Sequence, residues 1–187
     1  MTKTAVLMPV LLAIFLAGCG VPADRYPVPT VEVKETQRIA FASVELRDVS
    51  LPTYAGNDEI TVEDDSGKLV SDPISLWADQ PKRAISLELA RNLVRLTKAR
   101  VASEPWPFEE PADARLEVRF ETLLAGSDGV FRASGQYFVS VVEGRERSGL
   151  FDLGVPITGD GGPQAIARAR GQVIFDLARL LAREGLR

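Results

Sequence analysis

The segment Leu116-Glu117-Val118-Arg119-Phe120-Glu121 alternates apolar and charged residues and is the clearest fold signal in this chain of 187 residues. Because successive side chains of a strand point to opposite faces of a sheet, the alternation predicts a strand with one buried and one solvated face. Two more strands are expected, within residues 130–142 and 149–153, after turns at 125–129 and 143–146. Three successive strands joined by short Gly-containing turns predict an antiparallel meander.

Two further strands are expected before this meander. Residues 38–49 alternate in two registers, which fits one strand or a strand with a break, and Pro52 ends the pattern. Residues 59–63 form a short alternating run, which the turn-forming Asp65-Ser66-Gly67 closes.

Two amphipathic helices are expected, at residues 78–96 and 163–184. Asp79 is the predicted N-cap of the first, and Pro residues 81 and 163 suit the first turns of the two helices. Their apolar stripes are Ile85, Leu89, Leu93 and Leu96, and then Ile166, Val173, Leu177 and Leu180 or Leu181. Each stripe needs a sheet to cover it. The chain therefore predicts an α/β (α+β) fold, an antiparallel or mixed sheet with two main helices packed on one face.

The first 18 residues read as a signal peptide, because Lys3 precedes an apolar run too short to span a bilayer. The run ends in Leu16-Ala17-Gly18-Cys19, which resembles a bacterial lipobox. Cys19 is the only Cys of the chain, so we expect fatty acyl groups such as palmitate on it; a Cys buried in a membrane helix is the alternative. In Gram-negative envelopes, an Asp directly after the lipidated Cys favours retention in the inner membrane. This chain has Gly20 at that position, which implies export to the outer membrane. The body would then face the periplasm.

A Pro-rich segment at residues 19–37 is expected to be a flexible tether that follows the lipidated Cys. Residues 38–187 are then a single domain, because about 150 residues suffice for one core and are few for two.

The composition excludes several classes of function. The chain has no His and a single Cys, which removes His-dependent nucleophilic triads, thiolate metal cages and intramolecular disulfides. A net charge of −4 gives no positive field for nucleic acid. The acidic run Glu63-Asp64-Asp65 lacks the spacing of a calcium loop. We therefore expect no catalytic site, no metal and no cofactor apart from the lipid on Cys19, and no nucleic-acid partner.

An ordered set of short motifs resembles the ABC-type transport auxiliary lipoprotein family over roughly residues 38–183. The motifs are Leu51-Pro52-Thr53-Tyr54, Ile60, Leu76-Trp77-Ala78-Asp79, residues 89–96, Pro105-Trp106-Pro107 and Val118-Arg119-Phe120-Glu121. The resemblance implies a fold like the N-terminal domain of TolB and an outer-membrane lipoprotein. It also implies partners, namely an MCE-domain protein and its inner-membrane transporter components, which move lipids between the two membranes or maintain the outer one.

The chain departs from that family in two places. It has only Tyr26 where members often carry an aromatic pair, and Glu63-Asp64-Asp65 where they often carry a basic residue. These departures leave open which transport system the chain serves.

Three segments are candidate partner contacts. They contain Leu51, Pro52 and Tyr54; Trp77; and Pro105, Trp106 and Phe108. For each segment a structural role is the alternative: a strand end covered by Tyr54, a Trp packed on the first helix, or a capped core Trp106.

The expected function is that of a non-catalytic auxiliary or docking component of an MCE/ABC-type lipid transport system. The alternative is a periplasmic protein that itself carries an acyl chain, which requires a sizeable apolar cavity. A periplasmic hydrolase ranks last, because the usual activators of a nucleophile are missing. Self-association into a homo-oligomer is left open.

Overall fold

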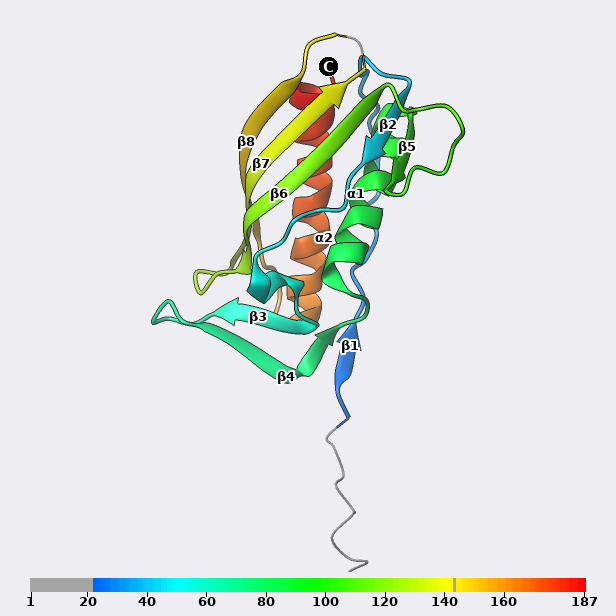
Figure 1. The fold of residues 1–187 in the computed structure, drawn as a ribbon. Coiled ribbons are helices and arrows are strands. Elements are labelled where there is room, and N and C mark those ends of the chain that lie inside the picture. Colours follow the sequence, from blue (N-terminus) through cyan, green and yellow to red (C-terminus); the bar gives the residue numbers. More distant parts are fainter. Residues whose placement is uncertain (1–21, 143) are drawn as a thin grey trace, which may run out of the picture.

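The computed structural model describes residues 22–142 and 144–187; the expected signal peptide, Cys19 and Gly20 lie outside these ranges. In the described part, an eight-stranded mixed sheet carries two long helices on one face, which confirms the predicted fold class (Figure 1). The strands are β1 (Asp24–Tyr26), β2 (Ser43–Leu46), β3 (Glu59–Glu63), β4 (Leu69–Trp77), β5 (Arg100–Ser103), β6 (Ala114–Ala125), β7 (Val130–Val141) and β8 (Arg147–Pro156). The helices are α1 (Pro81–Thr97) and α2 (Pro163–Leu180), with a 3-10 turn η2 (Thr53–Gly56) and a π-helical turn η3 (Leu181–Gly185).

The predicted meander is present as β6, β7 and β8, which pair antiparallel in that order. Leu116, Val118 and Phe120 face the helices and are buried, whereas the residues between them lie on the open face. The rings of Phe120 and Phe151 meet edge to face, with centroids 5.4 Å apart. This inner face and the two helices enclose the core.

Strand β6 pairs with β7 along one edge and with two further strands, β2 and β3, along the other. Strand β2 pairs parallel with its first residues, at Val44 and Ala114, and β3 pairs with its last residue, at Val62 and Ala125. The sheet therefore splits into two branches, β2–β5 at one end of β6 and β3–β4–β1 at the other.

The strand expected over residues 38–49 is shorter than predicted, because only β2 pairs with neighbours. The residues before it contact helix ends instead: the N–H of Gln37 donates to the carbonyl of Leu96, and the N–H of Ala40 to that of Leu186, both at 2.7 Å. Since these donors satisfy carbonyls at the ends of α1 and η3, they are not available for a strand ladder.

Helix α1 begins later than predicted, and Asp79 is not its N-cap. The N-cap is Gln80, which makes no side-chain cap bond, and Pro81 takes the first helical position. One carboxylate oxygen of Asp79 accepts the N–H of Gln80, while the other pairs with Arg83 on the first turn of the helix. Helix α2 begins at Pro163, as expected, and buries Ile166, Val173 and Leu177, while Leu181 is buried in η3.

The tether expected up to residue 37 is instead packed against the domain from residue 24 onward. Strand β1 pairs parallel with the end of β4, and Val28, Val31 and Val33 pack on the core. Glu35 forms an ion pair of 2.8 Å with Arg179 of α2. We call residues 24–35 the N-terminal strap; its valines provide the apolar contacts that a free tether lacks.

Replacing Gly171 by Ala is expected to loosen the strap. An added Cβ would lie 2.9 Å from Val28 Cγ1 and 3.0 Å from the Pro29 carbonyl oxygen, closer than packed atoms tolerate. We expect at least roughly tenfold faster hydrogen exchange in residues 25–33, because local opening governs exchange there. Gly56→Ala is the control, because its Cβ would meet no atom within 4 Å. Unchanged exchange in Gly171→Ala would show that the strap is held elsewhere.

No helix in the described ranges combines the length and the apolar character that crossing a bilayer requires.

Candidate interaction surfaces

The segment with Leu51, Pro52 and Tyr54 has a structural role at the end of β6. All three residues are half-buried. The Tyr54 hydroxyl accepts the N–H of Leu123 at 3.3 Å, and the Thr61 hydroxyl donates to the Tyr54 carbonyl at 3.4 Å. Tyr54 thus holds η2 against β3 and β6.

Trp77 is buried and covers a buried ion pair. The guanidinium carbon of Arg170 lies 4.4 Å from the centre of the Trp77 ring, a cation–π contact. Arg170 Nη2 donates to Glu88 Oε1 at 2.8 Å, and the Arg170 side chain is only 2% exposed. Burial raises the pKa of Glu88, an effect that the adjacent Arg170 opposes, and burial lowers the pKa of Arg170.

Sequence reasoning missed this pair, although a signal for it exists. Arg170 falls four residues after Ile166 and three before Val173, inside the predicted apolar stripe of α2. A cation at such a position needs a buried partner on a neighbouring element. Beside the pair lies a surface hollow of about 210 Å³, which Tyr26 and Val28 of the strap border.

The segment with Pro105, Trp106 and Phe108 forms a compact loop between β5 and β6. The Trp106 and Phe108 rings meet edge to face at 4.9 Å, and Trp106 Nε1 donates to the Glu110 carbonyl at 2.8 Å. The Arg100 guanidinium lies 4.9 Å from the centre of the exposed Phe108 ring. These contacts hold two aromatic rings in place at the surface.

Trp106 borders a hollow of about 230 Å³ together with Glu45, Arg115 and Val142. Val142 is 76% exposed. Arg115 Nε binds Glu45 Oε2 at 2.7 Å, and this contact raises the pKa of Arg115. The hollow thus joins an aromatic ring, an exposed apolar side chain and an ion pair.

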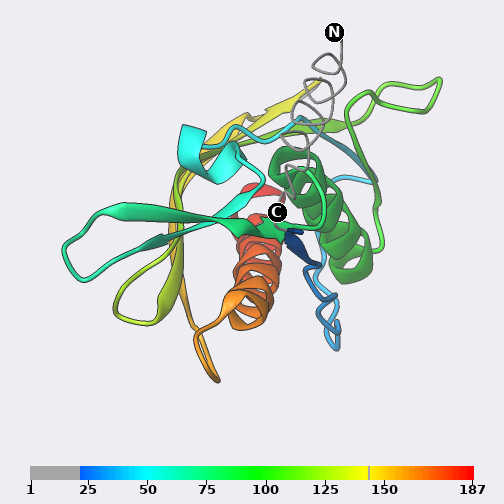
Figure 2. The same ribbon diagram turned by 90° about the horizontal axis from the view of Figure 1, so that it is seen from below.

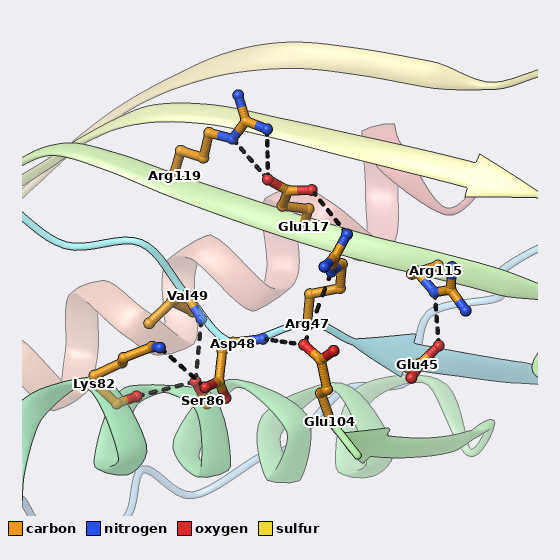
Figure 3. Close-up of polar contacts among 10 residues, drawn as sticks. All are labelled: Glu45, Arg47, Asp48, Val49, Lys82, Ser86, Glu104, Arg115, Glu117 and Arg119. Carbon is orange, nitrogen blue, oxygen red and sulfur yellow. Dashed lines mark hydrogen bonds and ion pairs between the residues drawn. The ribbon is translucent and has the colours of Figure 1, made fainter. Parts of the chain in front are cut away.

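From Arg115 the open face of the sheet continues as a set of ion pairs, which Figure 3 shows. Arg47 lies 3.8 Å from Glu104 and 3.9 Å from Glu117, and Glu117 pairs with Arg119 at 2.6 Å. Such exposed pairs contribute little to stability, so their main effect is to place both signs of charge at fixed positions. We call Trp106, Val142, Glu45, Arg115, Arg47, Glu104, Glu117 and Arg119 the docking surface.

A second group of contacts in Figure 3 fixes the segment after β2 against α1. Lys82 Nζ pairs with Asp48 at 3.0 Å, and the Ser86 hydroxyl accepts the N–H of Val49 at 3.3 Å while donating to the Lys82 carbonyl at 2.9 Å. These bonds hold Arg47 in position from its C-terminal side.

The structure does not gather the predicted contact residues into one site. In Figures 1 and 2, η2 lies beside β3 at one end of the molecule, and the loop with Trp106 lies beside β5 near the other. Trp77 is buried at the same end as η2, where it borders a small hollow together with Tyr54. Among the three predicted segments, only the Trp106 loop belongs to the docking surface.

Comparison with known proteins gives one family and a set of similar folds. The model of the ABC-type transport auxiliary lipoprotein component family matches residues 26–182. A crystal structure of an uncharacterized protein has a TM-score of 0.67 at 18% identity and covers 86% of this chain and 98% of its own. A Xanthomonas campestris protein of the family DUF330 has a TM-score of 0.66 at 18% identity, with coverages of 86% and 93%. Curated protein sequences give no match.

Proposed function

Because the chain belongs to the family of ABC-type transport auxiliary lipoprotein components, we propose that it docks an MCE-type lipid transport system at the outer membrane. In this proposal, acyl groups on Cys19 hold a non-catalytic head on the periplasmic side of that membrane. The head binds the MCE-domain protein and, through it, the transporter components of the inner membrane.

The docking surface is the observation that carries the proposal. Its aromatic, apolar and Arg side chains are the types that dominate binding energy in protein interfaces. The ion pairs beside them present alternating charges, which favour one orientation of a partner over others. Neither a catalytic group nor a deep pocket is needed for this role.

The interior supports docking over transport of an acyl chain by the head itself. The hollow that Tyr54, Trp77, Ile85 and Phe131 border, between helix and sheet, measures about 20 Å³. A space of that size holds about one water molecule. An acyl chain between helices and sheet would need the core to open.

The test is capture of the MCE-domain protein by the acylated lipoprotein from envelope extracts, with the partner identified by mass spectrometry. Trp106→Ala and Arg115→Ala are each expected to weaken capture at least about tenfold, because hot-spot residues of these types contribute that much. Leu87→Ala is the control, because Leu87 is an exposed apolar residue of α1, on the helix layer. Capture by both variants at the level of Leu87→Ala would contradict the proposal.

A further inference from the structure

The hairpin of β3 and β4 projects from the body of the molecule (Figures 1 and 2). Over residues 69–74 both faces of β4 are exposed, so this part of the strand belongs to no core. It nevertheless carries three large apolar side chains, Leu69, Val70 and Ile74, which are 39%, 41% and 43% exposed. Leu69 and Val70 are neighbours in a regular ladder and therefore point to opposite faces of the hairpin. Apolar side chains on both faces of a projecting arm indicate that something apolar covers it.

The hairpin lies at the end of the molecule where the chain enters the fold. Asp24 of β1 pairs with Ser75 of β4, immediately after Ile74. Val70 is five residues from Ser75, which in a strand amounts to about 17 Å. Cys19 is five residues before Asp24, and a fully extended chain of five residues spans at most about 18 Å. A lipid on Cys19 therefore keeps the bilayer within reach of the hairpin.

Building on the anchor of the proposed function, we propose that Leu69, Val70 and Ile74 rest in the surface of the bilayer that Cys19 anchors. Once the anchor is inserted, the short connection holds these side chains at a high local concentration against the bilayer. Their transfer out of water then fixes how the head is oriented. The loop between β5 and β6 and the C-terminal end of β7, which Val142 follows, lie toward the opposite end, so this part of the docking surface is presented away from the membrane (Figure 1).

The charges of the hairpin set which bilayer it prefers. Its turn contains three acidic residues, Glu63, Asp64 and Asp65, and one basic residue, Lys68. Asp64 accepts bonds from the Ser66 hydroxyl and from the N–H groups of Ser66 and Lys68, which lower its pKa and keep it ionised. An acidic turn is repelled by anionic headgroups. The contact is therefore stronger on phosphatidylethanolamine-rich bilayers than on bilayers rich in phosphatidylglycerol.

The test uses the acylated protein, in which Cys19 is blocked and no other Cys is present. Val70→Cys and Val142→Cys each add one free thiol in place of an exposed Val, and an NBD fluorophore is attached to it. The proteins are reconstituted in vesicles of phosphatidylethanolamine with one-tenth phosphatidylglycerol, with or without doxyl-labelled lipid. We expect doxyl lipid to quench the probe at residue 70 at least about threefold more than at residue 142.

Each outcome bears on the proposal. Stronger quenching at residue 70, reduced when phosphatidylglycerol replaces most of the phosphatidylethanolamine, supports it. Equal quenching at both positions in protein that floats with the vesicles overturns the hairpin contact and leaves the docking function intact. If the NBD emission at residue 70 shifts to the blue only when the MCE-domain protein is bound, the hairpin belongs to a protein interface. That result also overturns the proposed contact with the bilayer. Protein that carries no acyl group by mass spectrometry, and does not float, contradicts the anchor and the hairpin contact together.

Discussion

Replacing Arg170 by Met is expected to lower the free energy of unfolding by about 3–5 kcal/mol at pH 8, because it leaves a buried carboxylate without its partner. Glu88 is held between the helices, and its Oε1 receives its bond from Arg170. Met fills a volume similar to that of the Arg stem but offers no donor and no charge. Denaturation by urea, followed by circular dichroism, measures the loss.

The loss should depend on pH in a stated direction. Burial already raises the pKa of Glu88, and Arg170 opposes that rise, so removing Arg170 raises the pKa further. The folded variant then keeps a proton that the unfolded chain has released. The contribution of Glu88 to the stability of the variant is therefore largest below the carboxyl pKa of the unfolded chain, about 4.3, and is lost as the pH rises through the higher folded pKa. We expect a smaller loss at pH 5 than at pH 8.

Two controls separate this effect from a general loss of packing. The double variant Arg170→Met with Glu88→Met removes both charges, and we expect it to recover most of the stability and to lose the added pH dependence. Arg132→Ala breaks the exposed pair with Asp128 and should change stability little. A loss in Arg170→Met that is the same at pH 5 and pH 8 would show that Glu88 does not depend on Arg170 for its charge.

The parts of the fold that were predicted correctly share a one-sided environment. In β6 and β7 and in the two helices, one face packs on the core and the other meets water. The spacing of apolar residues in the sequence therefore indicates whether each segment is a strand or a helix. Strand β4 was missed for the opposite reason: residues 69–74 are exposed on both faces, and Pro73 interrupts the pattern. The prolines of the strap predict a flexible tether, and they interrupt the pattern of the valines that pack on the core.

The candidate surfaces were predictable only in part, because their contacts join distant segments. Trp106 is recognisable in the sequence as an aromatic residue between two prolines, and it does belong to the docking surface. The pair of Arg115 with Glu45, by contrast, depends on the parallel register of β2 and β6, in which Glu45 and Arg115 are direct partners. No local pattern specifies a register between strands 70 positions apart in the sequence. The exposed hairpin likewise became visible only from its place in the fold.

Replacing Gly135 by Ala is the second substitution with a large expected effect, because it would break the pairing of β6 with β7. Gly135 lies opposite Phe120, where the register between the two strands shifts. A Cβ built at this position would lie 2.0 Å from the Arg119 carbonyl oxygen and 3.0 Å from Phe120 Cα. Both are backbone atoms, so no side-chain rotation can relieve the overlap.

Since the strands must separate locally, we expect Gly135→Ala to lower the free energy of unfolding by about 3 kcal/mol or more, in the range typical of backbone overlap in a core. For a domain of this size, that amounts to a drop of roughly 6–12 °C in Tm, which differential scanning calorimetry resolves. Gly154→Ala on β8 is the matched control, because its Cβ would meet only the Val130 Cγ1 atom, at 3.1 Å. Glu117 and Arg119 lie on the open face in the part of β6 that pairs with β7 next to Gly135, so we expect Gly135→Ala to weaken capture of the MCE-domain protein as well. A Tm equal to that of Gly154→Ala would mean that β6 can move away from β7 without cost, and that the strand pairing does not hold the charged side chains in place.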